Sequence, residues 1–147
     1  MFDKILVVCV GNICRSPSGE YLLKEYLPNK TVNSAGIATA KSGLSGKSAD
    51  KMANTIAQEH GYSLDAHQAQ QLTPELCRDH DLILVMEKGH IEAVTHIAPE
   101  ARGKIMLFGQ WVGQKDIPDP YRQSREAFEH AYMLIEQAAN AWVAKLK

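Results

Sequence analysis

The sequence predicts an α/β fold: an open four-stranded parallel sheet with helices on both faces. Short apolar runs typical of buried strands alternate along the chain with segments of helical spacing, which is the pattern of parallel sheets. The first apolar run leads into a tight loop and then into a helix, an arrangement in which backbone N–H groups and the helix dipole point at the loop. We therefore expect a phosphate-binding loop after the first strand.

The first strand is expected over residues 4–9, because this apolar run shows no polar alternation. Gly11 and Asn12 follow it, and both residue types tolerate unusual backbone angles in tight loops. Ser16 is a good N-cap residue and Pro17 suits the first helical position. The sequence therefore predicts that Ser16 caps the first helix.

The remaining elements follow from apolar runs, helical spacing and helix-ending residues. The first helix is expected to end near Tyr26, before a proline. In order, we then expect a strand at 31–34, a loop at 39–48, a helix at 49–60, an irregular stretch at 65–73, a helical turn at 74–77, a strand at 82–86, a helix at 90–97, a strand at 104–108, a loop at 109–121 and a long helix after Ser124. Because a parallel sheet binds ligands at the carboxyl ends of its strands, the site is expected at the end of the first strand.

The bulk composition limits the classes of function. A chain of 147 residues fits a single domain spanning 1–147, and a net charge of −1 argues against a nucleic-acid binder and a polybasic membrane anchor. The early apolar run is too short to insert into a membrane. Three cysteines form no disulfide framework, which favours a cytoplasmic location. We expect a monomer that binds no nucleic acid and does not insert into a membrane.

The loop combines a thiol with a guanidinium. Cys9 ends the first strand and Arg15 follows six residues later, so a thiolate nucleophile and a fork that matches phosphate oxygens share one loop. Backbone N–H groups and Arg15 would hold a phosphate above the sulfur and favour its thiolate form, and Ser16 could donate a hydrogen bond to the sulfur. This predicts a phosphocysteine intermediate that water hydrolyses.

A leaving alkoxide or phenoxide needs a proton, so a general acid is required from elsewhere in the chain. Asp119 is the best candidate, because the loop after the last strand returns to the edge of the sheet that holds Cys9. Asp116 is the weaker second choice. Taken alone, each residue has an ordinary explanation: a cysteine at a strand end is usually a buried apolar residue, and an aspartate before a proline is usually a turn residue. Their combination with the Cys9-to-Arg15 spacing favours catalysis.

The other candidate ligands and nucleophiles are expected to be structural. Cys77 is expected to pack in the core. The six histidines do not fall at paired metal-ligand spacings, so we expect no metal and no cofactor.

The segment from Cys9 to Pro17 and the tripeptide Asp119-Pro120-Tyr121 resemble motifs of the low-molecular-weight protein tyrosine phosphatases. The likeness to this family runs over essentially the whole chain. The resemblance implies that Cys9 is the nucleophile, Arg15 the transition-state clamp and Asp119 the general acid and then base. It implies that the phosphate-binding loop and its supports are Val10, Gly11, Asn12, Ile13, Cys14, Ser16, Ser34 and His67. It also implies that the walls of an aryl pocket are Val10, Ile13 and Tyr121.

The likeness is strongest to a Gram-negative branch associated with exopolysaccharide export, through the segments 86–91 and 119–122. It implies that the substrate is a phosphotyrosine protein, namely the cytoplasmic tail of an autophosphorylating tyrosine kinase of the inner membrane. Arg122 stands where eukaryotic members carry a second tyrosine, and no aromatic residue lies near Ala40. A family motif, His-x-Ala-Arg-Gln, is changed at residues 67–71. These departures concern the choice of substrate and local packing and leave the catalytic set intact.

Two other activities use similar parts. An arsenate reductase would need resolving cysteines after the third strand, whereas Cys77 precedes that strand and no cysteine follows it. A phosphocysteine carrier of sugar transport would keep a cysteine at a strand end but would need neither Arg15 nor a general acid. A phosphotyrosine-binding module without turnover would be expected to lack Cys9 or Asp119.

Overall fold

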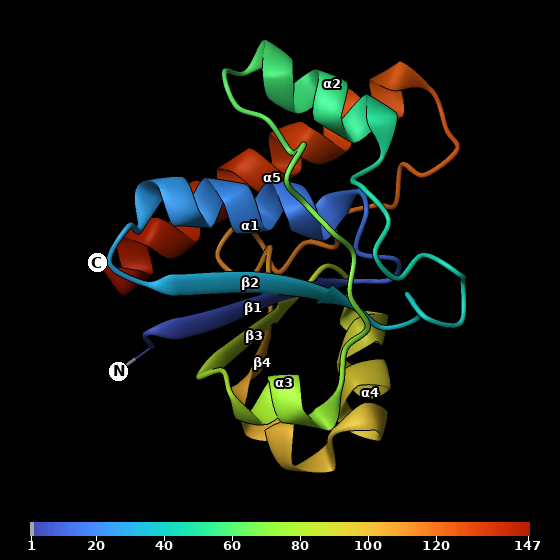
Figure 1. Cartoon of the computed structure of the whole chain (residues 1–147). Helices are drawn as coiled ribbons and strands as arrows, with labels where there is room; N and C mark the ends of the chain where they lie inside the picture. Colours follow the sequence, from blue (N-terminus) through green and yellow to red (C-terminus); the bar gives the residue numbers. More distant parts are fainter. Residues whose placement is uncertain (1) are drawn as a thin grey trace.

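The computed structural model describes residues 2–147. Its strands form one open parallel sheet in the order β2-β1-β3-β4, which confirms the predicted fold class (Figure 1). The strands are β1 Lys4–Cys9, β2 Thr31–Gly36, β3 Leu82–Val85 and β4 Ile105–Leu107. Because β1 lies between β2 and β3, the loop that follows it opens at the middle of the carboxyl edge of the sheet.

Helices cover both faces of this sheet, as predicted. The helices are α1 Arg15–Tyr26, α2 Lys51–Glu59, α3 Pro74–Arg78, α4 Lys88–Ile97, the 3₁₀ helix η1 Pro99–Lys104 and α5 Arg125–Leu146. Figure 1 shows α1, α2 and α5 on one side of the sheet and α3 and α4 on the other. Most bounds lie within two residues of the expected ones, and η1 was not predicted. No helix within residues 2–147 has the length and apolar character needed to span a membrane.

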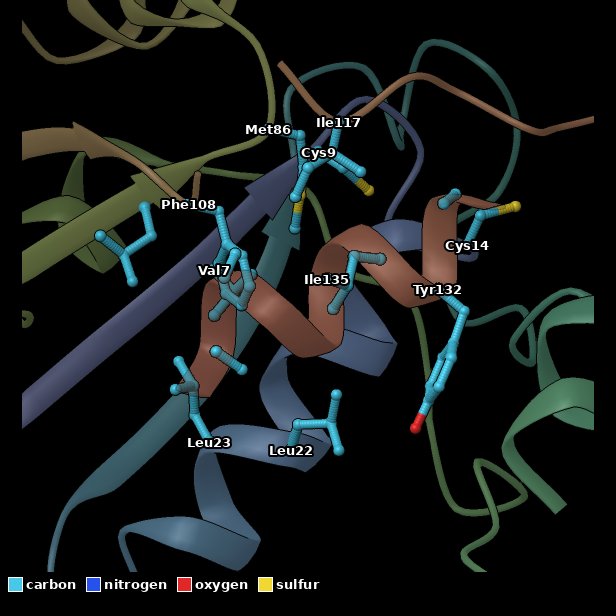
Figure 2. Packing of buried hydrophobic residues seen from close by; sticks show 14 of the residues in the cluster. Val7, Cys9, Cys14, Leu22, Leu23, Met86, Phe108, Ile117, Tyr132 and Ile135 are labelled. Carbon is cyan, nitrogen blue, oxygen red and sulfur yellow. The ribbon is translucent and has the colours of Figure 1, made fainter. Parts of the chain in front are cut away.

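The two cores arise from the alternation of side chains along β1. Ile5, Val7 and Cys9 point into the core beneath α1 and α5, whereas Leu6 and Val8 point into the core beneath α4 and η1. Figure 2 shows Val7, Cys9 and their neighbours in the first core, and it places Cys9 close to Met86 and Ile117 at the strand ends. The nucleophile candidate is therefore the last residue of a strand that is buried from Ile5 to Cys9.

The predicted cap of the first helix was wrong. Helix α1 begins at Arg15, one residue before Ser16, and among residues 2–147 no side chain caps its first turn. Ser16 lies inside that turn, and its Oγ is 2.9 Å from the Sγ of Cys9. The hydroxyl contacts the sulfur because the loop brings residue 16 back beneath the end of β1, a contact that helix-capping rules do not consider.

Candidate active site

A pocket of about 290 Å³ opens at the carboxyl end of β1. Its lining comes from three stretches: the end of β1 through the first residue of α1, the segment after β2, and the loop before α5. The lining residues are Cys9, Val10, Gly11, Ile13, Cys14, Arg15, Ser42, Leu44, Asp119, Tyr121 and Arg122. The structure thus brings the three predicted catalytic residues to one pocket, and the three predicted pocket walls, Val10, Ile13 and Tyr121, line the same space.

The loop turns sharply at Asn12, whose φ of 62° lies in the left-handed region, as expected for a residue type that tolerates it. This turn directs the backbone N–H of Asn12 toward Cys9, and it donates to Sγ at 3.3 Å. The end of β2 closes against the same loop at Gly36, where a Cβ atom would lie 2.6 Å from the carbonyl oxygen of Val10. Only glycine fits there, so β2 braces the loop from the side.

The side chain of Asn12 fixes the direction of the hydrogen bonds beneath the sulfur. Its Oδ1 accepts from the backbone N–H of Gln70 at 3.0 Å, which leaves Nδ2 to donate to Ser16 Oγ at 2.7 Å and to Ser34 Oγ at 2.9 Å. Because Ser16 Oγ accepts from Asn12, its own hydrogen is free to point at Cys9 Sγ. The amide therefore leaves the Ser16 hydroxyl able to donate to the sulfur of Cys9.

The network continues away from the pocket through Ser34 and His67. The hydroxyl of Ser34 donates to Glu20 Oε1 at 2.5 Å. His67 Nε2 lies 2.6 Å from the carbonyl oxygen of Asn12, which can only accept, so this nitrogen carries a proton. His67 Nδ1 lies 4.0 Å from Glu20. Asn12, Ser16, Ser34 and His67 thus lie in one connected network. Glu20 and Gln70 also belong to it, although neither was predicted from the sequence.

Arg15 is buried, and its guanidinium is held from two sides. Nη1 donates to Glu87 Oε2 at 2.6 Å and to the carbonyl oxygen of Ile117 at 2.8 Å. Nη2 lies 3.8 Å from Asp119 Oδ2. A buried guanidinium needs such partners because an unpaired charge inside the protein is costly. Glu87 and Ile117 thus hold Nη1 of the guanidinium, and Nη2 lies on the side of Asp119.

Glu87 is the main residue that the sequence analysis missed. It directly precedes α4, and its carboxylate also lies 3.9 Å from His90 Nε2. Burial, and next the charge of Arg15, lower the pKa of His90, so this histidine is neutral at neutral pH. The role of Glu87 could have been inferred from the rule that a buried arginine requires a carboxylate. Glu87 follows β3, and the end of this strand lies at the same edge of the sheet as Arg15.

The structure separates the two candidate acids. Asp119 lines the pocket, and its Oδ1 accepts from the backbone N–H of Tyr121 at 3.0 Å. Asp116 instead accepts from the backbone N–H of Lys88 at the start of α4, and it does not line the pocket. The backbone N–H of Ile117 donates to the carbonyl oxygen of Met86 at 2.8 Å. This hydrogen bond brings the loop that carries Asp116 and Asp119 back to the strand ends, as predicted from the sequence. The geometry therefore favours Asp119.

The other two cysteines have different surroundings. Cys14 lines the pocket, but burial, and then the charges of Asp50, Cys9 and Asp119, raise the pKa of its thiol. Cys77 is buried in the core on the opposite face of the sheet, and burial raises the pKa of its thiol as well. Within residues 2–147, no group of three or more histidine, cysteine, aspartate or glutamate side chains is arranged to hold a metal ion.

Comparisons with known proteins identify the family of the chain. Residues 4–147 match the family model described as low molecular weight phosphotyrosine protein phosphatase. The chain is 56% identical over 146 residues to the probable low molecular weight protein-tyrosine-phosphatase AmsI of Erwinia amylovora, covering 99% of each protein.

Two solved structures extend the likeness. Vibrio vulnificus Wzb in complex with benzylphosphonate has a TM-score of 0.98 and 68% identity, over 99% of this chain and all of the other. The tyrosine phosphatase Wzb of Escherichia coli K30 in complex with sulphate has a TM-score of 0.95 and 52% identity, over 100% of both chains.

Proposed function

The chain belongs to the low molecular weight phosphotyrosine protein phosphatase family, and from this premise we propose that it hydrolyses phosphotyrosine in proteins through a phosphocysteine intermediate. The observation that carries the mechanism is that Cys9, Arg15 and Asp119 line one pocket of about 290 Å³. A nucleophile, a cation for the phosphate and an ionisable acid are the three groups that the reaction needs.

In the first step the phosphate occupies the loop, where Arg15 and backbone N–H groups bind its oxygens. The thiolate of Cys9 attacks phosphorus, an S–P bond forms, and the bond from phosphorus to the tyrosine oxygen breaks. Asp119 donates its proton to that oxygen as it leaves. The hydrogen bonds from Ser16 and from the Asn12 N–H stabilise the thiolate before attack.

In the second step a water molecule attacks the phosphorus of the phosphocysteine. The Asp119 carboxylate, now deprotonated, takes a proton from this water, the S–P bond breaks, and inorganic phosphate leaves. The same Ser16 and Asn12 donors stabilise the Cys9 thiolate as it is released. Arg15 compensates the charge of the phosphoryl group in both steps, a role that a divalent metal plays in other phosphatases.

The walls of the pocket favour an aryl phosphate. Val10, Ile13, Leu44 and Tyr121 supply apolar surface around the opening above Cys9. A relative of this chain binds benzylphosphonate, which joins an aromatic ring to a phosphonate much as phosphotyrosine joins one to a phosphate. A long, flat side chain reaches the sulfur at the bottom of such a pocket, whereas a phosphoserine is too short.

We further propose that the substrate is the cytoplasmic tail of an autophosphorylating membrane tyrosine kinase of polysaccharide export, and that the enzyme acts in the cytoplasm as a monomer. The support is the resemblance to the exopolysaccharide-associated branch and the sequence identity to its named members. The chain is 56% identical to AmsI, and 68% and 52% identical to the two Wzb structures above. To test this, the kinase tail is purified in its phosphorylated form and the enzyme is added. We expect the tail to lose its phosphotyrosine.

The function itself is tested with p-nitrophenyl phosphate and with paired phosphotyrosine and phosphoserine peptides. We expect the wild type to hydrolyse the ester and the phosphotyrosine peptide in excess chelator, and to act much more slowly on phosphoserine. Cys9→Ser should be inactive on all three while keeping its circular-dichroism spectrum. Activity that vanishes with chelator and returns with a divalent ion, or equal kcat/KM for the two peptides, would contradict the proposal.

A further inference from the structure

A second pocket, of about 400 Å³, lies beside the active-site pocket. Tyr121 and Arg122 line both, so the two spaces share one rim. The far wall comes from the first turns of α2 and α5 and includes Lys51, Met52 and Phe128. A peptide whose phosphotyrosine enters the active-site pocket would pass its neighbouring residues over this rim.

The charges around the second pocket favour an anion. Among residues 2–147, neither Lys51 nor Arg122 forms an ion pair, and the guanidinium of Arg122 lies over the ring of Tyr121 at 5.2 Å. The one carboxylate of the lining, Asp50, is engaged elsewhere: its Oδ1 accepts from the backbone N–H groups of Met52 and of the next residue in the first turn of α2. Within residues 2–147, two cations without a carboxylate partner therefore line a space whose one carboxylate caps a helix.

The backbone holds Arg122 at this rim. Its φ of 63° lies in the left-handed region, where a residue with a long side chain is uncommon. The turn is closed by a hydrogen bond from the N–H of Gln123 to the carbonyl oxygen of Pro120 at 2.9 Å. An uncommon backbone conformation that directs a charged residue toward a pocket suggests a functional position.

We propose that the second pocket is a subsite that binds an acidic side chain next to the phosphotyrosine of the protein substrate. The proposal rests on the proposed function and names the substrate feature that the site selects. Lys51 and Arg122 bind the negative group, and the apolar surface of Met52 and Phe128 contacts its carbon atoms. A glutamate, an aspartate or a second phosphotyrosine shares this chemistry.

The test is a panel of phosphotyrosine peptides in which one flanking residue in turn is glutamine, glutamate or phosphotyrosine. The wild type should show a higher kcat/KM for the glutamate peptide than for the matched glutamine peptide, by about 5-fold at low salt, because exposed ion pairs are each worth up to ~1 kcal/mol. A larger gain with phosphotyrosine than with glutamate would identify the phosphorylated neighbour as the preferred group. The preference should fall as salt rises to about 1 M, where the Debye length is roughly 3 Å.

Lys51→Glu should abolish or reverse the preference while leaving p-nitrophenyl phosphate hydrolysis unchanged, because Lys51 lies outside the active-site pocket. Lys147→Glu makes the same change of charge one residue past the end of α5, at a side chain that lines neither pocket, and should keep the preference. A glutamate preference that is absent, or that survives Lys51→Glu, overturns the subsite. If the wild type hydrolyses no phosphotyrosine peptide at all, the proposed function fails instead.

Discussion

The phosphate-binding loop and the loop that carries Asp119 form opposite walls of one pocket, yet they are built differently. On the first wall Asn12 and Arg15 are 0% and 2% exposed, and every polar group beneath the sulfur has a defined partner. On the second wall the side chain of Asp119 is 46% exposed and Tyr121 is 38% exposed, with few hydrogen bonds to hold them. The wall formed by the phosphate-binding loop is thus buried and hydrogen-bonded, and the wall that carries Asp119 is exposed to solvent.

The difference fits what each wall is proposed to bind. Every substrate of such an enzyme presents the same phosphate, so a rigid set of donors serves all of them, and buried polar groups remain satisfied only when they interlock. The protein around the phosphotyrosine varies, so the outer wall must stay in contact with solvent and substrate. We therefore expect changes in the inner wall to affect all substrates alike, and changes in the outer wall to depend on the substrate.

Among changes that keep Cys9, the largest effect is expected from Asp119→Ala. Because tyrosine leaves poorly as an anion, loss of the acid should lower kcat for phosphotyrosine by about 10²–10⁴-fold. An ester of a strongly acidic phenol should lose much less. The measurement is kcat for aryl phosphates of graded leaving-group pKa: the wild type should show a shallow dependence and the variant a steep one. Parallel slopes would exclude Asp119 as the acid and direct attention to Asp116.

Asn12→Gly should lower kcat by the same factor for all leaving groups, in contrast to Asp119→Ala. Glycine keeps the left-handed backbone of residue 12 but removes the amide that orients Ser16 and Ser34. We expect kcat to fall by up to about 10²-fold, because small misplacements of a reacting group are costly, and to fall equally for good and poor leaving groups. Asn12→Ala adds backbone strain and should also lower the melting temperature further. A loss that varies with leaving group would show that the two walls are not independent.

Glu87→Gln should have a smaller effect of the same kind. The amide keeps the size of the side chain but removes the charge that pairs with Arg15 at 2.6 Å. We expect kcat to fall by about 10-fold, which corresponds to about 1.4 kcal/mol. Glu92→Gln is the matched control, since Glu92 pairs with Arg102 in an exposed ion pair away from the pocket. Equal activity of the two variants would mean that Ile117 and Asp119 position the guanidinium without the charge of Glu87.

The smallest effect is expected from Cys14→Ala. Burial raises the pKa of the Cys14 thiol, so below that pKa, and hence at neutral pH, it stays protonated and is a poor nucleophile although it lines the pocket. The rate of inactivation by iodoacetamide should therefore change by less than about 2-fold in Cys14→Ala. Mass spectrometry of the inactivated wild type should place the adduct on Cys9. An adduct on Cys14 would contradict this assignment.

The sequence by itself determined the parts of the protein that depend on local periodicity and spacing. The buried apolar runs and the helical stripe of α5 predict the parallel sheet and its layers. The catalytic spacing from Cys9 to Arg15 lies within one strand–loop–helix unit, so its geometry follows from the local chain. The position of Asp119 was also predictable, because the ends of parallel strands meet at one edge.

Only the tertiary structure decided which groups satisfy the buried polar atoms. Ser16 was predicted to cap a helix and instead contacts a sulfur, and Glu87, Glu20 and Gln70 were not predicted to support the site. These partners are distant in the sequence, and no periodicity marks them. A buried donor requires an acceptor, but which residue supplies it depends on how strands and loops pack around the sheet edge, and that packing is not local.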